Sequence, residues 1–190
     1  MDTLIKIQNT QLRTERLILR PFVETDLNDF YAYASVEGVG EMAGWPHHTD
    51  IEISKQILQD FIDKQEVFAL VDLTTQKVIG SLGVHRSWAN EVPEFEELKV
   101  KEIGYVLAKD YWGQGLVPEA VCAVIQYGFE QWNLDAFTIG HFKHNHQSRR
   151  VIEKCGFTFY KEDTYEAKQL DQVFEDRKYI RFKNNDAHKV

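Results

Sequence analysis

The sequence predicts an α/β or α+β fold, in which a mixed β-sheet is flanked by helices. Short apolar stretches predict strands, and longer stretches with apolar residues at helical spacing predict helices. Along the chain these elements follow the order β-α-α-β-β-β-α-β-α-β-β. The 190 residues, 43% of them hydrophobic and 27% charged, suit a single domain over residues 1–190, with its core in residues 12–182 and frayed termini.

The first half of the chain is expected to supply strands, a helix pair and a hairpin. Residues 12–22 form a first strand, in which Leu17 and Leu19 alternate with other side chains. Thr25 can cap a helix over residues 26–34, and Thr49 or Asp50 can cap a second that ends at Gln65. The remaining expected segments are a glycine-containing loop over residues 36–49, a hairpin of strands 67–72 and 78–85, and a long connection over residues 87–101.

The centre of the chain is a strand, a glycine turn and an amphipathic helix. Residues 102–107 are apolar after the first residue and short enough for a buried strand. The turn over residues 112–115 contains two glycines, which suit a tight bend or a ligand lying close to the backbone. One apolar helix face follows, made of Val121, Val124, Ile125, Gly128, Phe129 and Trp132.

The start of this helix is a candidate anion site. Pro118 suits the first helical position and Glu119 suits the positive end of the helix dipole. Val117, at the expected cap position, has no side chain that can accept the free N–H groups of the first turn. Phosphate is the usual acceptor at such a helix start, and capping by water is the alternative.

The end of the chain is expected to add three strands and one helix. A strand over residues 136–142 precedes a helix over residues 148–154, which ends at Gly156. Strands over residues 157–161 and 176–182 are separated by an acidic connection, and a polar tail follows.

Charge and cysteine content limit the possible functions. The 22 basic and 30 acidic side chains give a net charge of −8, which argues against a nucleic-acid-binding protein and permits a cationic amine as substrate. Cys122 and Cys155 have no metal-binding or redox spacing, so both are interpreted as reduced thiols in or near the core of a cytoplasmic protein. No apolar run is long enough for a signal peptide or a membrane span.

Three motifs resemble the GNAT superfamily of acyl-CoA-dependent N-acetyltransferases. The turn DYWGQG over residues 110–115 is similar to the family pattern Q/R-x-x-G-x-G/A, with Asp110 in place of Gln or Arg. The segment NHQSRRVIEKCGF over residues 145–157 and the opening TERLILRPF over residues 14–22 are similar to motifs of the RimJ/RimL-like branch, which includes ribosomal-protein acetyltransferases. Their combination in this order is far more specific than any one of them.

The resemblance implies a GNAT-like, mostly antiparallel sheet and an acetyl-CoA site. The backbone N–H groups of the glycine turn and helix start would hold the pyrophosphate, while the central strand would pair with the pantetheine arm. Asn145 and Ser148 would contact the cofactor, and Arg149 or Arg150 would reach a phosphate unless both merely face solvent. The implied backbone contacts are Gly113, Gln114, Gly115, Leu116 and Val117 for the pyrophosphate, and Val106 and Leu107 for the arm.

The same resemblance implies an amine acetylation by direct transfer in a ternary complex. Glu102 is the candidate base that removes a proton from the amine, directly or through water, and the Leu107 N–H is the candidate donor to the oxyanion. Many members carry a tyrosine acid where this chain has Ile152, so Ser148 is the candidate substitute. A mechanism without any acid is the alternative.

Acceptor residues and partners are the least determined features. Trp45 and His47, in the loop that borders the acceptor pocket in this family, and Trp88 are the candidate acceptor contacts; no metal site is expected. The acceptor is a primary amine, either a protein N-terminus or a small molecule, and the chain is a monomer or a homodimer without a nucleic-acid or membrane partner. The alternative function is a non-catalytic acyl-CoA-binding sensor or partner subunit; a phosphotransferase is disfavoured because the required lysine is missing.

Overall fold

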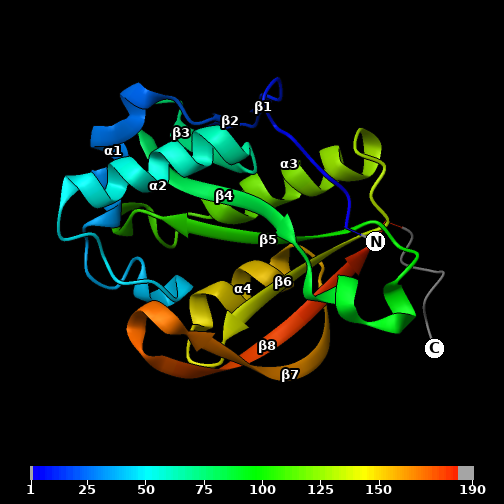
Figure 1. Cartoon of the computed structure of the whole chain (residues 1–190). Coiled ribbons are helices and arrows are strands. Elements are labelled where there is room, and N and C mark those ends of the chain that lie inside the picture. The colour runs from blue at the N-terminus through cyan, green and yellow to red at the C-terminus, as the bar shows by residue number, and fades with distance from the viewer. Residues whose placement is uncertain (1, 184–190) are drawn as a thin grey trace.

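A computed structural model describes residues 2–183 as one eight-stranded sheet with four helices (Figure 1). The strand order is β1-β2-β3-β4-β5-β6-β8-β7, and every neighbouring pair is antiparallel except β5 and β6. The strands are β1 (Leu12–Arg13), β2 (Leu17–Pro21), β3 (Val67–Asp72), β4 (Val78–Arg86), β5 (Val100–Leu107), β6 (Ala136–Phe142), β7 (Thr158–Ala167) and β8 (Gln172–Phe182). The helices are α1 (Leu27–Ala34), α2 (Ile51–Lys64), α3 (Leu116–Glu130) and α4 (His146–Lys154).

The sheet separates two apolar clusters, as the alternation of side chains along β3 shows. Phe68 and Leu70 pack in the cluster that contains the apolar faces of α3 and α4. Val67, Ala69 and Val71 pack in the cluster that contains α1 and α2. Successive side chains of a strand point to opposite faces, so α1 and α2 cover one face of the sheet and α3 and α4 cover the other. The predicted mixed sheet flanked by helices is confirmed.

The N-terminal segment differs from the prediction in three respects. The predicted single strand over residues 12–22 is a pair, β1 and β2, because Thr14 turns the chain and its Oγ1 accepts the Leu17 N–H at 3.0 Å. The core begins before residue 12, because Ile5 and Ile7 are buried in the cluster beneath α3. Thr25 is not a helix cap; Asp26 accepts the Val23 N–H at 2.9 Å, and α1 begins at residue 27.

The observed first residues of α3 and α4 differ from the predicted ones, whereas the cap of α2 was predicted. Asp50 caps α2 as predicted, with its side chain accepting the Glu52 N–H. Helix α3 begins at Leu116 after Gly115, so Pro118 lies at the third helical position rather than the first. Helix α4 begins at residue 146 because the Asn145 side chain accepts the Ser148 N–H at 3.0 Å.

The last two strands form one long hairpin. The segment predicted as an acidic connection belongs to β7 and β8, which pair from Thr158↔Ile180 to Ala167↔Gln172. The predicted frayed tail over residues 184–190 lies outside the described residues. Within residues 2–183, no helix has the length and apolar character to cross a membrane. The cytoplasmic location and the single domain stay predictions.

Strands β5 and β6 separate, and this feature positions the candidate site. The two strands are paired from Val100↔Ala136 to Ile103↔Ile139, and no pairing continues beyond Ile103 along β5. They start side by side and run apart toward their C-terminal ends (Figure 1). Residues 104–107 therefore keep β4 on one edge and have no strand on the other.

Candidate functional site

A cavity of about 1130 Å³ opens where β5 and β6 separate. Its lining comes from β4, β5, β6, the start of α3 and the inner face of α4, with the loop before α2 and the β7–β8 hairpin at its rim. The central lining residues are Glu102, Gly104, Tyr105, Leu107, Gly140, Phe142, Asn145 and Ser148. A sheet edge exposed inside a cavity can pair with an extended ligand, because its N–H and C=O groups lack a strand partner.

Backbone geometry distinguishes the two arm-binding residues that the sequence suggested. Ala108 donates its N–H to the Ile79 carbonyl at 2.8 Å, so these opposed residues form a hydrogen-bonded pair. Hydrogen-bonded and non-bonded pairs alternate along an antiparallel ladder, so Val106 directs its N–H and C=O toward β4. Tyr105 and Leu107 direct theirs away from β4. The Leu107 C=O already accepts the Trp112 Nε1–H at 2.7 Å, so the Leu107 N–H is the group that remains for a ligand. Of the predicted pair, Leu107 thus faces the cavity with its backbone, and Tyr105 fits better than Val106.

The glycine turn adds N–H groups at one end of the cavity. Gly113 and Gly115 have φ values of 78° and 79°, a conformation that strains any residue with a Cβ. No side chain caps α3, whose Leu116 and Val117 line the cavity together with both glycines. Gln114 is not part of this lining. The free N–H groups and the helix dipole together are suited to bind an anion at this end of the cavity.

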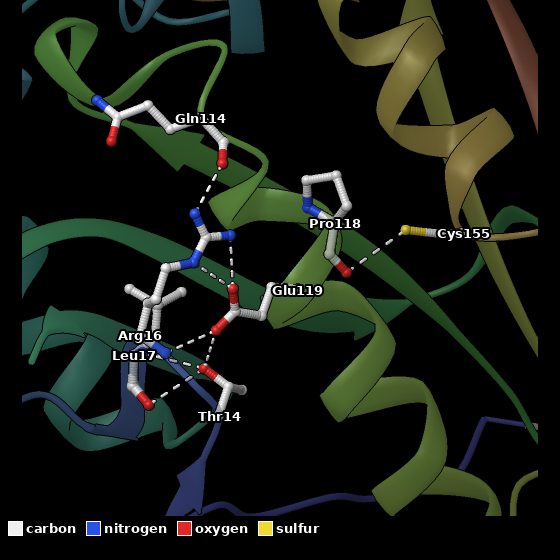
Figure 2. Close-up of polar contacts among 7 residues, drawn as sticks. All are labelled: Thr14, Arg16, Leu17, Gln114, Pro118, Glu119 and Cys155. Carbon is white, nitrogen blue, oxygen red and sulfur yellow. Dashed lines mark hydrogen bonds and ion pairs between the residues drawn. The ribbon is translucent and has the colours of Figure 1, made fainter.

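An ion-pair network, here called the Arg16 clamp, holds the glycine turn in place (Figure 2). Arg16 donates from Nε to Glu119 Oε2 at 2.8 Å and from Nη1 to the Gln114 carbonyl at 2.9 Å. Thr14 Oγ1 and the Arg16 N–H donate to the other Glu119 oxygen. Burial opposes ionisation of Glu119, but the hydrogen bonds from Thr14 and Arg16 outweigh it and lower its pKa. The clamp joins the first hairpin, the turn and α3.

Helix α4 brings positive charge to the cavity. Arg150 and Lys154 are four residues apart, so they share one helix face, and both line the cavity. Arg149 points elsewhere, because its Nε donates to Glu153 Oε1 at 2.8 Å. Of the two arginines that the sequence suggested for a phosphate, Arg150 is the one that lines the cavity. The sequence analysis missed Lys154.

Glu102 lies in the cavity wall, where β5 is still paired with β6. It is half-buried, and its Oε2 accepts the Trp88 N–H at 3.4 Å. Burial raises the pKa of Glu102, although the positive charge of Lys178 opposes the shift. Lys178 itself pairs with the buried Asp176 at 2.7 Å. A carboxyl group with a raised pKa inside a cavity is suited to accept a proton from a bound ligand.

A tyrosine hydroxyl does reach the cavity, from the central strand rather than from the last helix. Ile152 is fully buried in the core, as its apolar side chain requires. Tyr105 Oη lies 2.7 Å from Ser148 Oγ, and both residues line the cavity. Burial raises the pKa of Tyr105, so its hydroxyl stays protonated and able to donate. Ser148 is therefore a hydrogen-bond partner of Tyr105, and Asn145 is the cap of α4.

The three predicted acceptor contacts fall into two groups. Trp45 and His47 line the cavity, and His47 is held by Glu41, whose oxygen lies 2.8 Å from Nδ1. Burial opposes ionisation of Glu41, but hydrogen bonds from His47 and Gly38 outweigh it and lower its pKa to about 2. Trp88 lies elsewhere: its ring stacks on Tyr160 in a separate apolar cluster and is not among the residues that line the cavity.

Several cavity residues had no sequence signal strong enough to identify them. His85 lies opposite Glu102 on β4 and also lines the cavity. Tyr165 lies at the rim, where its ring would meet a Cβ at Gly44 at 2.7 Å. Strand register brings His85 to Glu102, and the β7–β8 hairpin brings Tyr165 to the loop before α2. The sequence pattern identified Tyr105 only as a residue of a mostly apolar strand, with no sign of a role in the cavity.

Comparison with known proteins agrees with this geometry. The sequence model of the acetyltransferase (GNAT) domain family matches residues 16–158. The chain is similar to the N-acetyltransferase YoaA of Bacillus subtilis (strain 168), described as uncharacterized, with 27% identity over 151 residues that cover 77% of this chain and 81% of the relative.

Two solved structures share the fold. Ribosomal-protein-S5-alanine acetyltransferase from Vibrio fischeri has a TM-score of 0.71 at 20% identity, covering 93% of this chain and 98% of that one. The microcin C7 self-immunity acetyltransferase MccE, solved with acetyl-CoA and AMP, has a TM-score of 0.73 at 18% identity, covering 88% and 93%. The predicted fold and the predicted resemblance are both confirmed.

The Arg16 clamp makes a prediction about stability. Glu119→Gln should lower the free energy of unfolding by about 2 kcal/mol at pH 7, because a partly buried, charge-assisted network loses its anion. The effect should shrink as the pH falls through the lowered pKa of Glu119, since its stabilisation requires the ionised carboxylate. Urea unfolding at several pH values measures the loss of unfolding free energy and its dependence on pH. Glu15→Gln, an exposed neighbour of the clamp, is the matched control; an equal loss in that variant would contradict the assignment.

Proposed function

Because the chain belongs to the acetyltransferase (GNAT) family, whose members use acetyl-CoA as co-substrate, we propose that it transfers the acetyl group to a primary amine within a ternary complex. The observation that carries this proposal is the position of Glu102. This carboxyl group has a raised pKa and lies in the wall of a cavity that also contains an open strand edge and an anion site. These three features serve, respectively, the amine, the extended arm of acetyl-CoA and its phosphates.

The cavity offers a candidate contact for each part of acetyl-CoA. The N–H groups of the glycine turn and the start of α3 would hold the pyrophosphate, with Arg150 and Lys154 contributing positive charge. The backbone of Tyr105 would pair with the arm along the open edge of β5, and the Leu107 N–H would face the thioester, because the Leu107 carbonyl is held by Trp112. Acetyl-CoA supplies the activated acyl thioester. The roles of Asn145 and Ser148 are, in this proposal, to cap α4 and to position Tyr105.

Glu102 would act on the acceptor amine. An ammonium group has no free electron pair, so the amine must lose a proton before it can attack a carbonyl carbon. The raised pKa of Glu102 brings its basicity closer to that of an amine than an ordinary carboxylate allows. Lys178, paired with Asp176, would stabilise the ionised form in which Glu102 works as a base.

Tyr105 would act on the leaving group, the sulfur of CoA. Its protonated hydroxyl, hydrogen-bonded to Ser148, can donate a proton to the departing sulfur, and the Leu107 N–H can donate to the carbonyl oxygen as negative charge develops there. This pair supplies the group that Ile152 cannot supply. It therefore supports a working enzyme over a non-catalytic sensor.

The rim of the cavity supports a cationic acceptor. Trp45 and Tyr165 contribute aromatic rings that are not fully buried to the cavity lining, and such rings attract ammonium groups through their faces. The Vibrio fischeri structural neighbour is named for the alanine of ribosomal protein S5. A peptide α-amine is therefore the first acceptor to test, followed by polyamines, amino acids and aminoglycosides.

The base is tested by Glu102→Gln. This variant should lose about 10²- to 10⁴-fold in kcat with an accepted amine while its Kd for acetyl-CoA is unchanged, because only proton removal is affected. In the wild type, kcat/KM should rise with pH through the raised pKa of Glu102, and the variant should lack this rise. Thiol release and the mass of the acetylated amine measure turnover. Glu97→Gln, exposed on the connection before β5, is the control, and full activity of Glu102→Gln would refute the assignment.

The acid is tested by Tyr105→Phe, which removes one oxygen atom. Because a thiolate leaves tolerably without a proton, kcat should fall only about tenfold, and acetyl-CoA binding should not change. Steady-state kinetics with the same amine measure this loss. Tyr127→Phe, a half-buried tyrosine on α3, is the control. Equal rates for Tyr105→Phe and wild type would show that departure of the thiol requires no acid from Tyr105.

The phosphate contacts are tested on one helix by three variants. Arg150→Gln and Lys154→Gln should each weaken acetyl-CoA binding roughly fivefold and reduce its dependence on salt, because exposed ion pairs contribute about 1 kcal/mol. Arg149→Gln should leave the Kd unchanged, since Arg149 pairs with Glu153. Calorimetric titration at two salt concentrations measures all three. A larger effect at Arg149 than at Arg150 would reverse the assignment.

A further inference from the structure

The fold brings its two cysteines into contact. Cys122 lies on α3 and Cys155 follows the last residue of α4; they are 33 positions apart, yet their sulfur atoms are 3.8 Å apart. The Cys155 sulfur is also 3.8 Å from the Pro118 carbonyl oxygen, toward which it points (Figure 2). Residues 118 and 122 lie one above the other on a helix, so Cys155 packs against a single face of α3. The sequence separation had suggested no redox pair.

The two thiols differ in access and in chemistry. Cys122 is exposed, whereas Cys155 is 1% exposed, so a small oxidant in solution meets Cys122 first. Contact with the Cys155 thiol lowers the pKa of Cys122 against the effect of burial, and the nearby Arg181 guanidinium adds to the lowering. Arg181 is held at the end of α4, where its Nη1 donates to the Cys155 carbonyl at 2.5 Å. An exposed thiol with a lowered pKa, in contact with a second thiol, is the arrangement of an oxidation-sensitive cysteine.

We propose that Cys122 and Cys155 are an oxidation-sensitive thiol pair, which a hydroperoxide converts into an intramolecular disulfide. The Cys122 thiolate attacks one peroxide oxygen, the O–O bond breaks, and a sulfenic acid and hydroxide form. The Cys155 sulfur then attacks the Cys122 sulfur, the S–O bond breaks, and water leaves as the S–S bond forms. Overall, two thiols are oxidised and one hydrogen peroxide molecule is reduced to two water molecules.

Formation of the disulfide requires the two sulfur atoms to move closer together, and this movement would affect α3 and α4. The sulfur atoms must approach from 3.8 Å to about 2.05 Å. Rotation of the exposed Cys122 side chain can supply part of this change without moving the core. The bond would join the middle of α3 to the end of α4, and would draw Cys155 away from the Pro118 carbonyl in the first turn of α3. Both helices contribute residues to the cavity, so oxidation would act on elements that hold the site.

The test needs only the folded wild-type chain. Native protein is treated with hydrogen peroxide, quenched with catalase, alkylated with iodoacetamide in denaturant and analysed by intact and peptide mass spectrometry. We expect the loss of two hydrogen atoms, a linked pair of peptides containing residues 122 and 155, and full return of both thiols after dithiothreitol. Before oxidation, native alkylation should modify Cys122 well before Cys155, because only Cys122 is exposed.

Two variants and one condition separate the proposal from other oxidations. Cys155→Ala should accumulate oxygen on Cys122 without losing two hydrogen atoms, and Cys122→Ser should keep Cys155 reduced under the same treatment. Protein unfolded in urea should form the bond more slowly, because the contact depends on the fold. The proposal is overturned if wild-type Cys122 gains oxygen without linking to Cys155, if the link joins two chains, or if both thiols survive the treatment.

Discussion

The separation of β5 from β6 is the constraint on which the rest of the site depends. While the two strands are paired, as far as Ile103, they contribute Ile103, Phe137 and Ile139 to the core beneath α3. Beyond that point the edge of β5 has no strand partner, and its backbone groups require a partner from elsewhere. Glu102 lies just before the separation, and Tyr105 and Leu107 lie just after it. One topological event thus places a carboxyl group, a hydroxyl group and an open strand edge within a single cavity.

The start of α3 depends on residues distant in sequence. Positive φ values at Gly113 and Gly115 let the turn present its N–H groups. Within the turn, Trp112 Nε1 donates to the Leu107 carbonyl and Gln114 Nε2 donates to the Asp110 carbonyl. The Arg16 clamp adds support from outside the turn by joining the Gln114 carbonyl to Glu119 through one guanidinium. The clamp also uses both oxygens of Glu119, so this carboxylate is occupied away from the anion site. The N–H groups at the helix start therefore remain available to a ligand.

The sequence located the parts of the candidate site that local geometry specifies. The glycine turn and the uncapped helix start follow from spacing and from the type of residue, whereas Glu102 follows from the resemblance to the family. All of them border the cavity except Gln114. Parts that depend on strand register or on loop packing were missed or misplaced. Tyr105 reaches Ser148 because β5 passes alongside α4, and the ring of Trp88, a predicted acceptor contact, stacks on Tyr160 instead of lining the cavity. Contacts between residues distant in sequence leave no periodic pattern in the sequence.

By itself the sequence determined the fold class, the order of elements and the family, because hydrophobic period, turn residues and short motifs are local properties of the chain. It also determined which helix start could bind an anion. Only the tertiary structure decided that Arg150 rather than Arg149 lines the cavity, that the last two strands form one hairpin, and that Cys122 meets Cys155. The reason is physical: these outcomes depend on which surfaces the sheet brings together, and residues 33 positions apart carry no local record of their contact.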